Sequence, residues 1–213
     1  MTRPLLITDC DEVLLHMVRH FATWLDEAHA IDFALGAPDF STAMTRRDGT
    51  PPPTTDEMWA LLGGFFPGEM ARQTLVPGAA EALAAIATHA DIVILTNVQD
   101  VCHPARVDQL SRFGIEHRVV CNQGAKGAPV AKLVAEHRGE RGDPVTVFVD
   151  DLAQHHESVA RHAPGVHRLH LIAEPDLAAA HPPAPFAHAR LDEWAVARAW
   201  IEARFAEGVP ADT

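Results

Sequence analysis

The segment Leu5-Leu6-Ile7-Thr8-Asp9-Cys10-Asp11-Glu12-Val13-Leu14 joins a short apolar run to two carboxylates that stand one residue apart. A run of this length, followed at once by charge, is typical of a buried parallel strand whose carboxyl end opens onto a site. Residues i and i+2 of an extended chain point to the same side, about 6.6 Å apart. Asp9 and Asp11 are therefore predicted to face one pocket. A plain strand followed by an acidic turn would have the same local pattern, so the rest of the chain has to separate the two interpretations.

The bulk composition describes an acidic globular protein. A chain of 213 residues is long enough for one well-buried domain, or for one domain that carries a modest insertion. Its net charge of −12 argues against a surface that binds the phosphate backbone of nucleic acids, because such surfaces are built from clustered Lys and Arg. No apolar run reaches the roughly 18 residues that a membrane span needs.

The same sequence features predict a cytoplasmic location. No apolar stretch of signal-peptide length precedes the acidic pair. The three cysteines, Cys10, Cys102 and Cys121, are odd in number and have no close paired spacing, which suits reduced thiols. Cys10 lies between the two aspartates and is expected to point into the core on the opposite face of the strand.

Residues 15–77 are predicted to form an inserted, mainly helical cap. An apolar stripe predicts a helix over about residues 15–30. A second, short helix is expected after Thr55 or Asp56 and is predicted to be closed by Gly63-Gly64 and Pro67-Gly68. The short connections at both ends of the segment suit a hinged lid.

Residues 78–213 alternate between helical periods and apolar runs. Together with residues 1–14 they predict an α/β core with a Rossmann-like parallel sheet and helices on both faces. Expected strands cover residues 92–95, 117–121, 145–149 and 167–173, and expected helices cover 79–89, 104–113, 129–138, 153–161 and 191–205. Residues 174–188 are Pro- and Ala-rich and are expected to be a connector.

Polar residues end three of the predicted strands. They are Asp9 and Asp11 after the first, Thr96 and Asn97 after the second, and Asp150 and Asp151 after the fourth. Lys126 lies in the loop that follows the third strand. Because the carboxyl ends of parallel strands share one edge of the sheet, these side chains are predicted to converge there.

In order and spacing, these positions resemble the four motifs of the haloacid dehalogenase (HAD) superfamily. Asp9-Cys10-Asp11 is similar to its Asp-x-Asp motif, Thr96 to its strand-ending Ser or Thr, and Lys126 to its helix-opening Lys. Asp150-Asp151 is similar to its closing acidic pair. The resemblance covers the whole chain and implies a phosphatase-type member with a helical lid inserted after the first motif.

The resemblance implies Mg²⁺-dependent hydrolysis of a small phosphorylated metabolite. Asp9 would be the nucleophile that forms an aspartyl phosphate, and Asp11 would act as general acid and base. Thr96, Asn97 and Lys126 would bind the phosphate, with Thr96 and Lys126 also counted as catalytic. Mg²⁺ would be held by Asp9, Asp11 through its backbone carbonyl, Asp150 and Asp151. The expected partner is a small phosphate ester, with neither nucleic acid nor membrane; the sequence does not indicate an oligomeric state.

One position departs from the family pattern. Glu12 stands where the family's phosphatases usually have Gly, which eases the turn at the base of the lid. We expect Glu12 to face solvent, with a stiffened turn or a further carboxylate near the mouth as the other possibility. Alternatives to hydrolysis are a phosphomutase and a HAD-like binding or regulatory protein without turnover. Dehalogenation is disfavoured because enzymes of that type lack the second Asp.

The cap offers candidates for substrate contacts but does not name the substrate. They are Trp24, Arg46, Arg47, Trp59, Phe65 and Phe66. Aromatic residues in such a segment more often form its own core. Arg46-Arg47, beside a turn, could bind a second anionic group of the substrate. Thr96 and Asp150-Asp151 could also serve only as helix caps, and Lys132 is the alternative to Lys126.

Overall fold

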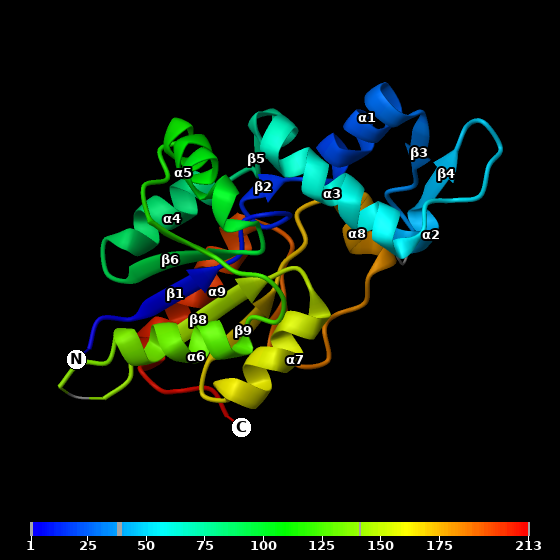
Figure 1. The fold of residues 1–213 in the computed structure, drawn as a ribbon. Coiled ribbons are helices and arrows are strands. Elements are labelled where there is room, and N and C mark those ends of the chain that lie inside the picture. The colour runs from blue at the N-terminus through cyan, green and yellow to red at the C-terminus, as the bar shows by residue number, and fades with distance from the viewer. Residues whose placement is uncertain (1, 38–39, 141, 213) are drawn as a thin grey trace.

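A computed structural model describes residues 2–37, 40–140 and 142–212, and only the backbone of Ser41. Its centre is a six-stranded parallel sheet with the strand order β10-β9-β8-β1-β6-β7 (Figure 1). In chain order the strands are β1 (Leu5–Thr8), β6 (Asp91–Thr96), β7 (Arg118–Cys121), β8 (Thr146–Asp150), β9 (His167–His170) and β10 (Ala189–Arg190). The predicted α/β class with a Rossmann-like parallel sheet is confirmed.

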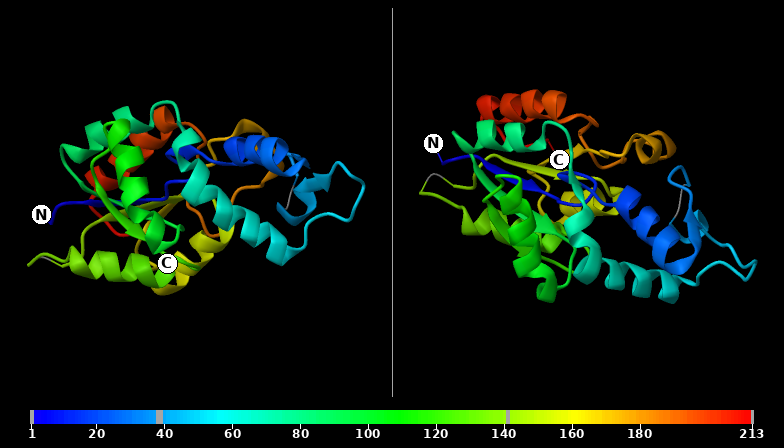
Figure 2. Two further views of the ribbon diagram at one scale, coloured as in Figure 1. Left: turned by 45° about the horizontal axis from the view of Figure 1, so that its top comes forward. Right: turned by 90° about the horizontal axis from the view of Figure 1, so that it is seen from above.

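Helices connect these strands and cover both faces of the sheet (Figure 2). They are α4 (Ala79–Ala87), α5 (His103–Arg112) after the 3₁₀ turn η2 (Asp100–Cys102), α6 (Gly127–Glu136), α7 (Ala153–His162), α8 (Pro175–Ala180) and α9 (Trp194–Glu207). Apolar residues of α4, α5 and α9 join the core on one face, and those of α6 and α7 join the core on the other. Among the described residues, no helix combines the length and the apolar character that crossing a membrane requires.

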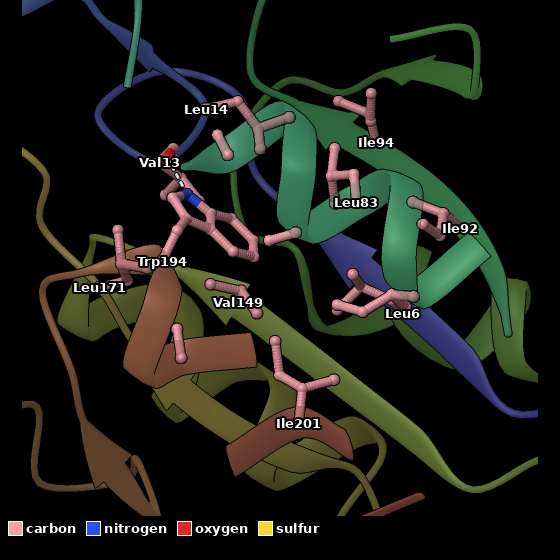
Figure 3. Close-up of a cluster of buried hydrophobic side chains, with 14 of the residues drawn as sticks. Leu6, Val13, Leu14, Leu83, Ile92, Ile94, Val149, Leu171, Trp194 and Ile201 are labelled. Atoms are coloured by element: carbon pink, nitrogen blue, oxygen red, sulfur yellow. Dashed lines mark hydrogen bonds between the residues drawn. The ribbon is translucent and has the colours of Figure 1, made fainter. Parts of the chain in front are cut away.

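The alternation of side chains along β1 explains why both faces are covered. Leu6 points into the cluster shared with α4 and α9, whereas Leu5 and Ile7 point into the cluster shared with α6 and α7. In the first cluster the Trp194 indole N–H also donates to the carbonyl of Val13, at 2.7 Å (Figure 3). Helix α9 therefore holds the turn that follows the Asp-x-Asp segment.

Residues 15–77, called the cap below, leave and return to the sheet at one place. Strand β2 (Leu15–His16) pairs antiparallel with β5 (Thr74–Leu75). Between them lie α1 (Val18–His29), β3 (Ile31–Phe33), α2 (Phe40–Ala43), β4 (Met44–Arg46), α3 (Thr55–Glu69) and the 3₁₀ turn η1 (Met70–Arg72). The cap is mainly helical, as expected, and it also contains a β3–β4 hairpin that the sequence pattern did not predict.

Two pairs were predicted to close α3, and the first of them, Gly63-Gly64, does not end the helix, which continues through Pro67-Gly68 to Glu69. Glycine inside a helix costs only about 1 kcal/mol relative to alanine, and tertiary packing offsets such a cost. Phe65, one residue beyond the glycines, is buried against Phe21 with ring centroids 5.4 Å apart. The helix begins one residue before the predicted start, where Thr54 and Glu57 form a capping box.

Two further elements lie where no regular structure was expected. Helix α8 occupies part of the 174–188 connector, and its Leu177 packs with Val18 of α1 and with Ile172. Strand β10 adds two residues to the edge of the sheet beside β9. Both elements are too short to produce a recognisable period.

Candidate active site

The site begins where β1 and β8 end side by side. The amide of Asp9 donates to the carbonyl of Val149, at 2.8 Å, which brings the carboxylates of Asp9 and Asp150 to the same edge of the sheet. The Lys126 ammonium lies between them, with Nζ 2.7 Å from Asp9 Oδ1 and 2.7 Å from Asp150 Oδ2. Asp9 lies 117 residues before Lys126, and Asp150 lies 24 residues after it, so residues far apart in the sequence share one charged cluster.

The carboxylate of Asp151 completes this cluster. One oxygen from each of Asp9, Asp150 and Asp151 lies within 4.8 Å of the others, and among the described residues this is the only such group of three possible ligands. Carboxylate oxygens are the donors that Mg²⁺ prefers. Three carboxylates face one ammonium here, so this donor set fits a divalent cation. We call Asp9, Asp150 and Asp151 the acidic corner.

The pKa values in the acidic corner show the cost of burying three carboxylates close together. Burial raises the pKa of Asp9 to about 7, and the charges of Asp150 and Asp11 add to the effect while Lys126 opposes it. Loss of water and the neighbouring charges of Asp150 and Asp9 raise the pKa of Asp151 well above its usual value. Burial would also raise the pKa of Asp150, but the Lys126 ammonium beside it holds it below its usual value.

Close packing of α6 on α7 fixes the position of Lys126. Gly127 begins α6, and its amide donates to the hydroxyl of Ser158 in α7, at 3.0 Å. A Cβ atom at Gly127 would lie 2.3 Å from the carbonyl oxygen of Ser158, so only glycine fits without a shift. The Lys126 side chain is fully buried, whereas the side chain of the alternative, Lys132, is 79% exposed. Burial and charge pairing therefore favour Lys126 over Lys132.

Thr96 ends β6 beside this cluster, and Asn97 follows it. The Thr96 hydroxyl donates to Asp11 Oδ2 at 3.4 Å. The Asn97 amide group donates to the carbonyl of Gly124, at 2.9 Å, and its oxygen accepts from Asn122 Nδ2 at 2.8 Å. The side chain of Asn97 thus ties the β6 loop to the loop before Lys126.

Asp11 lies next to the acidic corner but has its own partners. Arg106 Nη2 of α5 lies 2.9 Å from each oxygen of its carboxylate. Gln73 Nε2, in the linker where the cap returns to the core, donates to Asp11 Oδ1 at 2.6 Å. The sequence placed Asp9 and Asp11 on one pocket; in the structure the Asp9 side chain meets Lys126, and the Asp11 side chain turns to Arg106.

The expectation that Glu12 faces solvent is wrong. Its side chain is 1% exposed, and Oε1 accepts hydrogen bonds from the amides of Met17 (2.7 Å) and Val18 (2.6 Å) at the start of α1. Burial raises its pKa to about 7, although these two amides oppose the shift. Its backbone has a φ of 58°, the left-handed conformation that glycine adopts most easily. Glu12 thus keeps the turn that a glycine would make and adds acceptors for the amides at the start of α1.

Sequence reasoning missed the residues that hold these acids in place. Arg106 had a usable signal, since it lies on the same buried helix face as Gln109 and Leu110, where a charge needs a partner. His156 and His170 gave no such signal in the sequence. The Nε2 atom of His156 contacts the backbone carbonyl of Asp150 (3.0 Å), and that of His170 contacts the backbone carbonyl of Asp151 (2.8 Å). Cys10 is buried in the core, as predicted.

The cap candidates are largely occupied by contacts within the cap. Trp24, Phe65 and Phe66 belong to its apolar cluster, while Trp59 is 63% exposed. Arg46 pairs with Glu57 at 2.9 Å, and Arg47 pairs with Asp32 at 2.6 Å and with Asp26. Both guanidinium groups therefore already have anionic partners in this conformation.

Comparisons with known proteins identify the fold. No family model and no curated protein sequence matches the chain. Among solved structures, a HAD family hydrolase from Deinococcus radiodurans with bound phosphate and sodium is 15% identical, covers 95% of this chain and 96% of its own, and has a TM-score of 0.61. A protein described as the HAD-hydrolase YfnB from Bacillus subtilis, bound to magnesium, is 12% identical, covers 95% and 100%, and has a TM-score of 0.62.

A third structural neighbour is described as a β-phosphoglucomutase from Thermotoga maritima. It is 14% identical, covers 93% of this chain and 99% of its own, and has a TM-score of 0.58. The chain thus has the HAD-like hydrolase fold over nearly its whole length, as the sequence motifs predicted. Sequence identities this low show only the fold, and the activity has to be argued from the residues of the site.

Proposed function

We propose that the protein is a Mg²⁺-dependent phosphohydrolase that cleaves a small phosphorylated metabolite through an aspartyl phosphate on Asp9. The observation that carries this proposal is the acidic corner at the carboxyl ends of β1 and β8, where the Lys126 ammonium lies between Asp9 and Asp150. Such a cluster suits a substrate that brings negative charge together with a divalent cation.

The residues divide the reaction between them. An oxygen of Asp9 attacks phosphorus, the bond from phosphorus to the ester oxygen breaks, and Asp11 gives a proton to that oxygen. Water then attacks the aspartyl phosphate while Asp11 takes its proton, which releases inorganic phosphate and restores Asp9. Lys126 offsets the negative charge that collects between Asp9 and the phosphoryl group, and Thr96 and Asn97 hold phosphoryl oxygens.

Mg²⁺ would be held by the carboxylates of Asp9, Asp150 and Asp151 and by the backbone carbonyl of Asp11, and it would supply positive charge to the phosphoryl oxygens. The single ammonium of Lys126 cannot balance three carboxylates and a phosphate, so a further cation is needed for the substrate to bind. We expect the substrate to be a small molecule, in keeping with the net charge of −12. The three free thiols support a cytoplasmic setting.

The test is hydrolysis of 4-nitrophenyl phosphate by the wild type and by Asp9→Asn, with and without Mg²⁺. Asp108→Asn, an exposed position on α5, is the matched control. We expect Mg²⁺-dependent turnover in the wild type and the control, and a loss of at least about 10³-fold in Asp9→Asn, because the nucleophile is removed. Absence of wild-type turnover while Mg²⁺ and phosphate still bind would favour the regulatory alternative. Phosphate transfer to a second substrate hydroxyl in place of water would favour a phosphomutase.

A further inference from the structure

Arg106 is a buried charge that the reaction outlined above does not use. Its side chain is fully buried in α5, where an unpaired guanidinium would be strongly destabilising. Its two terminal nitrogens divide their contacts. Nη2 holds Asp11 as described, and Nη1 lies 3.1–3.2 Å from the side chains of Cys10, Gln73 and Gln109. The ring of Phe66, from the cap, lies 5.8 Å from the guanidinium carbon.

These contacts fix the direction of the Asp11 carboxylate. Oδ1 receives Arg106 Nη2 and Gln73 Nε2, and Oδ2 receives Arg106 Nη2 and the Thr96 hydroxyl. Donors from three segments therefore select one orientation of a short side chain. Asp11 and Arg106 both belong to the core, whereas Gln73 belongs to the segment that joins the cap to it.

Gln73 adds a connection to the cap. It lies between η1 and β5, in the linker by which the cap returns to the core, and it is buried. Gln109, one turn after Arg106 on α5, donates through Nε2 to Gln73 Oε1 at 3.3 Å and to the carbonyl of Met70, the first residue of η1. Arg106 and Gln109, both on α5, thus hold the side chain of Gln73.

We propose that Arg106 is a positioning residue that orients the carboxyl of Asp11 toward the leaving oxygen. Through Gln73, the orientation of this carboxyl also depends on the cap linker. The inference rests on the proposed function, because it concerns the proton transfer assigned to Asp11. Its consequence is specific: Arg106 matters most for substrates whose leaving group needs a proton, and least for those whose leaving group departs as an anion.

The experiment compares leaving groups. The wild type, Arg106→Gln and Arg106→Lys are assayed for kcat and KM with Mg²⁺ on 4-nitrophenyl phosphate, phenyl phosphate and an alkyl phosphate. Arg112→Gln, an exposed position on the same helix, is the control. For Arg106→Gln we expect kcat/KM to fall about 10²-fold or more on the alkyl ester and less than about tenfold on the nitrophenyl ester, since general acid catalysis contributes about 10²–10⁴-fold. Arg106→Lys restores part of the loss, and Arg112→Gln changes nothing.

A double-mutant cycle separates positioning from a loss of structure. If Arg106 acts through Asp11, Arg106→Gln has no further effect on turnover in an Asp11→Asn background, whereas a structural defect lowers activity in both. Gln73→Leu should reproduce the leaving-group pattern with a smaller loss, and it serves as the test if Arg106→Gln fails to fold. Equal losses on all esters, or faster alkyl ester cleavage, would overturn the inference. Absence of wild-type turnover on every ester would instead count against the proposed function.

Discussion

The carboxyl end of β1 carries acidic side chains in two different surroundings. In the acidic corner, three carboxylates lie together, and the single ammonium of Lys126 pairs with Asp9 and Asp150. In the adjacent turn, which we call the hinge corner, Asp11 is held by Arg106 and Gln73, and Glu12 is held by two backbone amides of α1. The protein supplies the donors for the hinge corner itself, while the acidic corner retains an excess of negative charge. The first arrangement suits a ligand that arrives with positive charge, and the second suits side chains that have to keep their direction.

The largest effect is expected from removing the only cation of the acidic corner. Lys126→Met leaves Asp9 and Asp150 buried without their partner, and we expect a loss of about 3–5 kcal/mol in unfolding free energy and of about 10²–10³-fold in kcat. Urea denaturation and the 4-nitrophenyl phosphate assay measure the two effects. Lys132→Met removes the other lysine of the chain, which is exposed, and should change stability by less than about 0.5 kcal/mol. Equal effects of the two substitutions would show that the acidic corner does not depend on the charge of Lys126.

A second effect concerns cation binding. Asp151→Asn removes one of the three carboxylates, so the Mg²⁺-dependent rise in melting temperature should need at least about tenfold more Mg²⁺. Without Mg²⁺ the variant should melt at the same or a higher temperature, because the pKa of Asp151 is raised and its charge is unfavourable in the folded state. Differential scanning fluorimetry across a Mg²⁺ series, with Asp108→Asn as control, measures both. An unchanged Mg²⁺ response would show that Asp151 does not contribute to the cation site.

The smallest effect is expected at Glu12, in the hinge corner. Glu12→Ala removes the acceptor for two amides of α1 and should cost about 1 kcal/mol, whereas Glu12→Gln keeps an acceptor. The pKa of Glu12 is raised from 4.5 to about 7, so its contribution to stability is full below pH 4.5 and is lost as the pH rises through about 7. The unfolding free energy of Glu12→Gln, relative to that of the wild type, should therefore rise between pH 5 and 8, as measured by urea denaturation at each pH. A difference that stays constant with pH would contradict the burial of an ionisable group at this position.

The difference between the two corners also explains what could be predicted from the sequence. Asp9, Thr96 and Asp150 each end an apolar run, and parallel strands bring such ends together, so local pattern and topology suffice to place them. The hinge corner depends on contacts between segments that the pattern does not relate. Arg106 and Gln73 lie 95 and 62 residues after Asp11, and nothing in their local sequence indicates that they meet.

Glu12 shows the same limit at short range. A carboxylate five residues before a helix amide can cap it only if the intervening turn folds back, and this turn needs the left-handed φ of 58° at Glu12 itself. A non-glycine residue rarely adopts that conformation, so the sequence pattern favoured solvent exposure. The α3 helix illustrates the same principle, because it continues past Gly63-Gly64, where Phe65 is buried, and ends only after Pro67-Gly68.

For the design of sequence libraries on this scaffold, the contact between α6 and α7 sets a constraint that mutating a single position cannot remove. The Cβ of any residue at position 127 meets a backbone oxygen at position 158, so shortening the Ser158 side chain does not make room. Accommodation requires the two helices to move apart, and the chain enters them directly after Lys126 in one case and shortly after Asp150 and Asp151 in the other. Variants at position 127 would therefore fail an activity screen even when they fold. A library that keeps this glycine and varies the cap avoids this loss of active members.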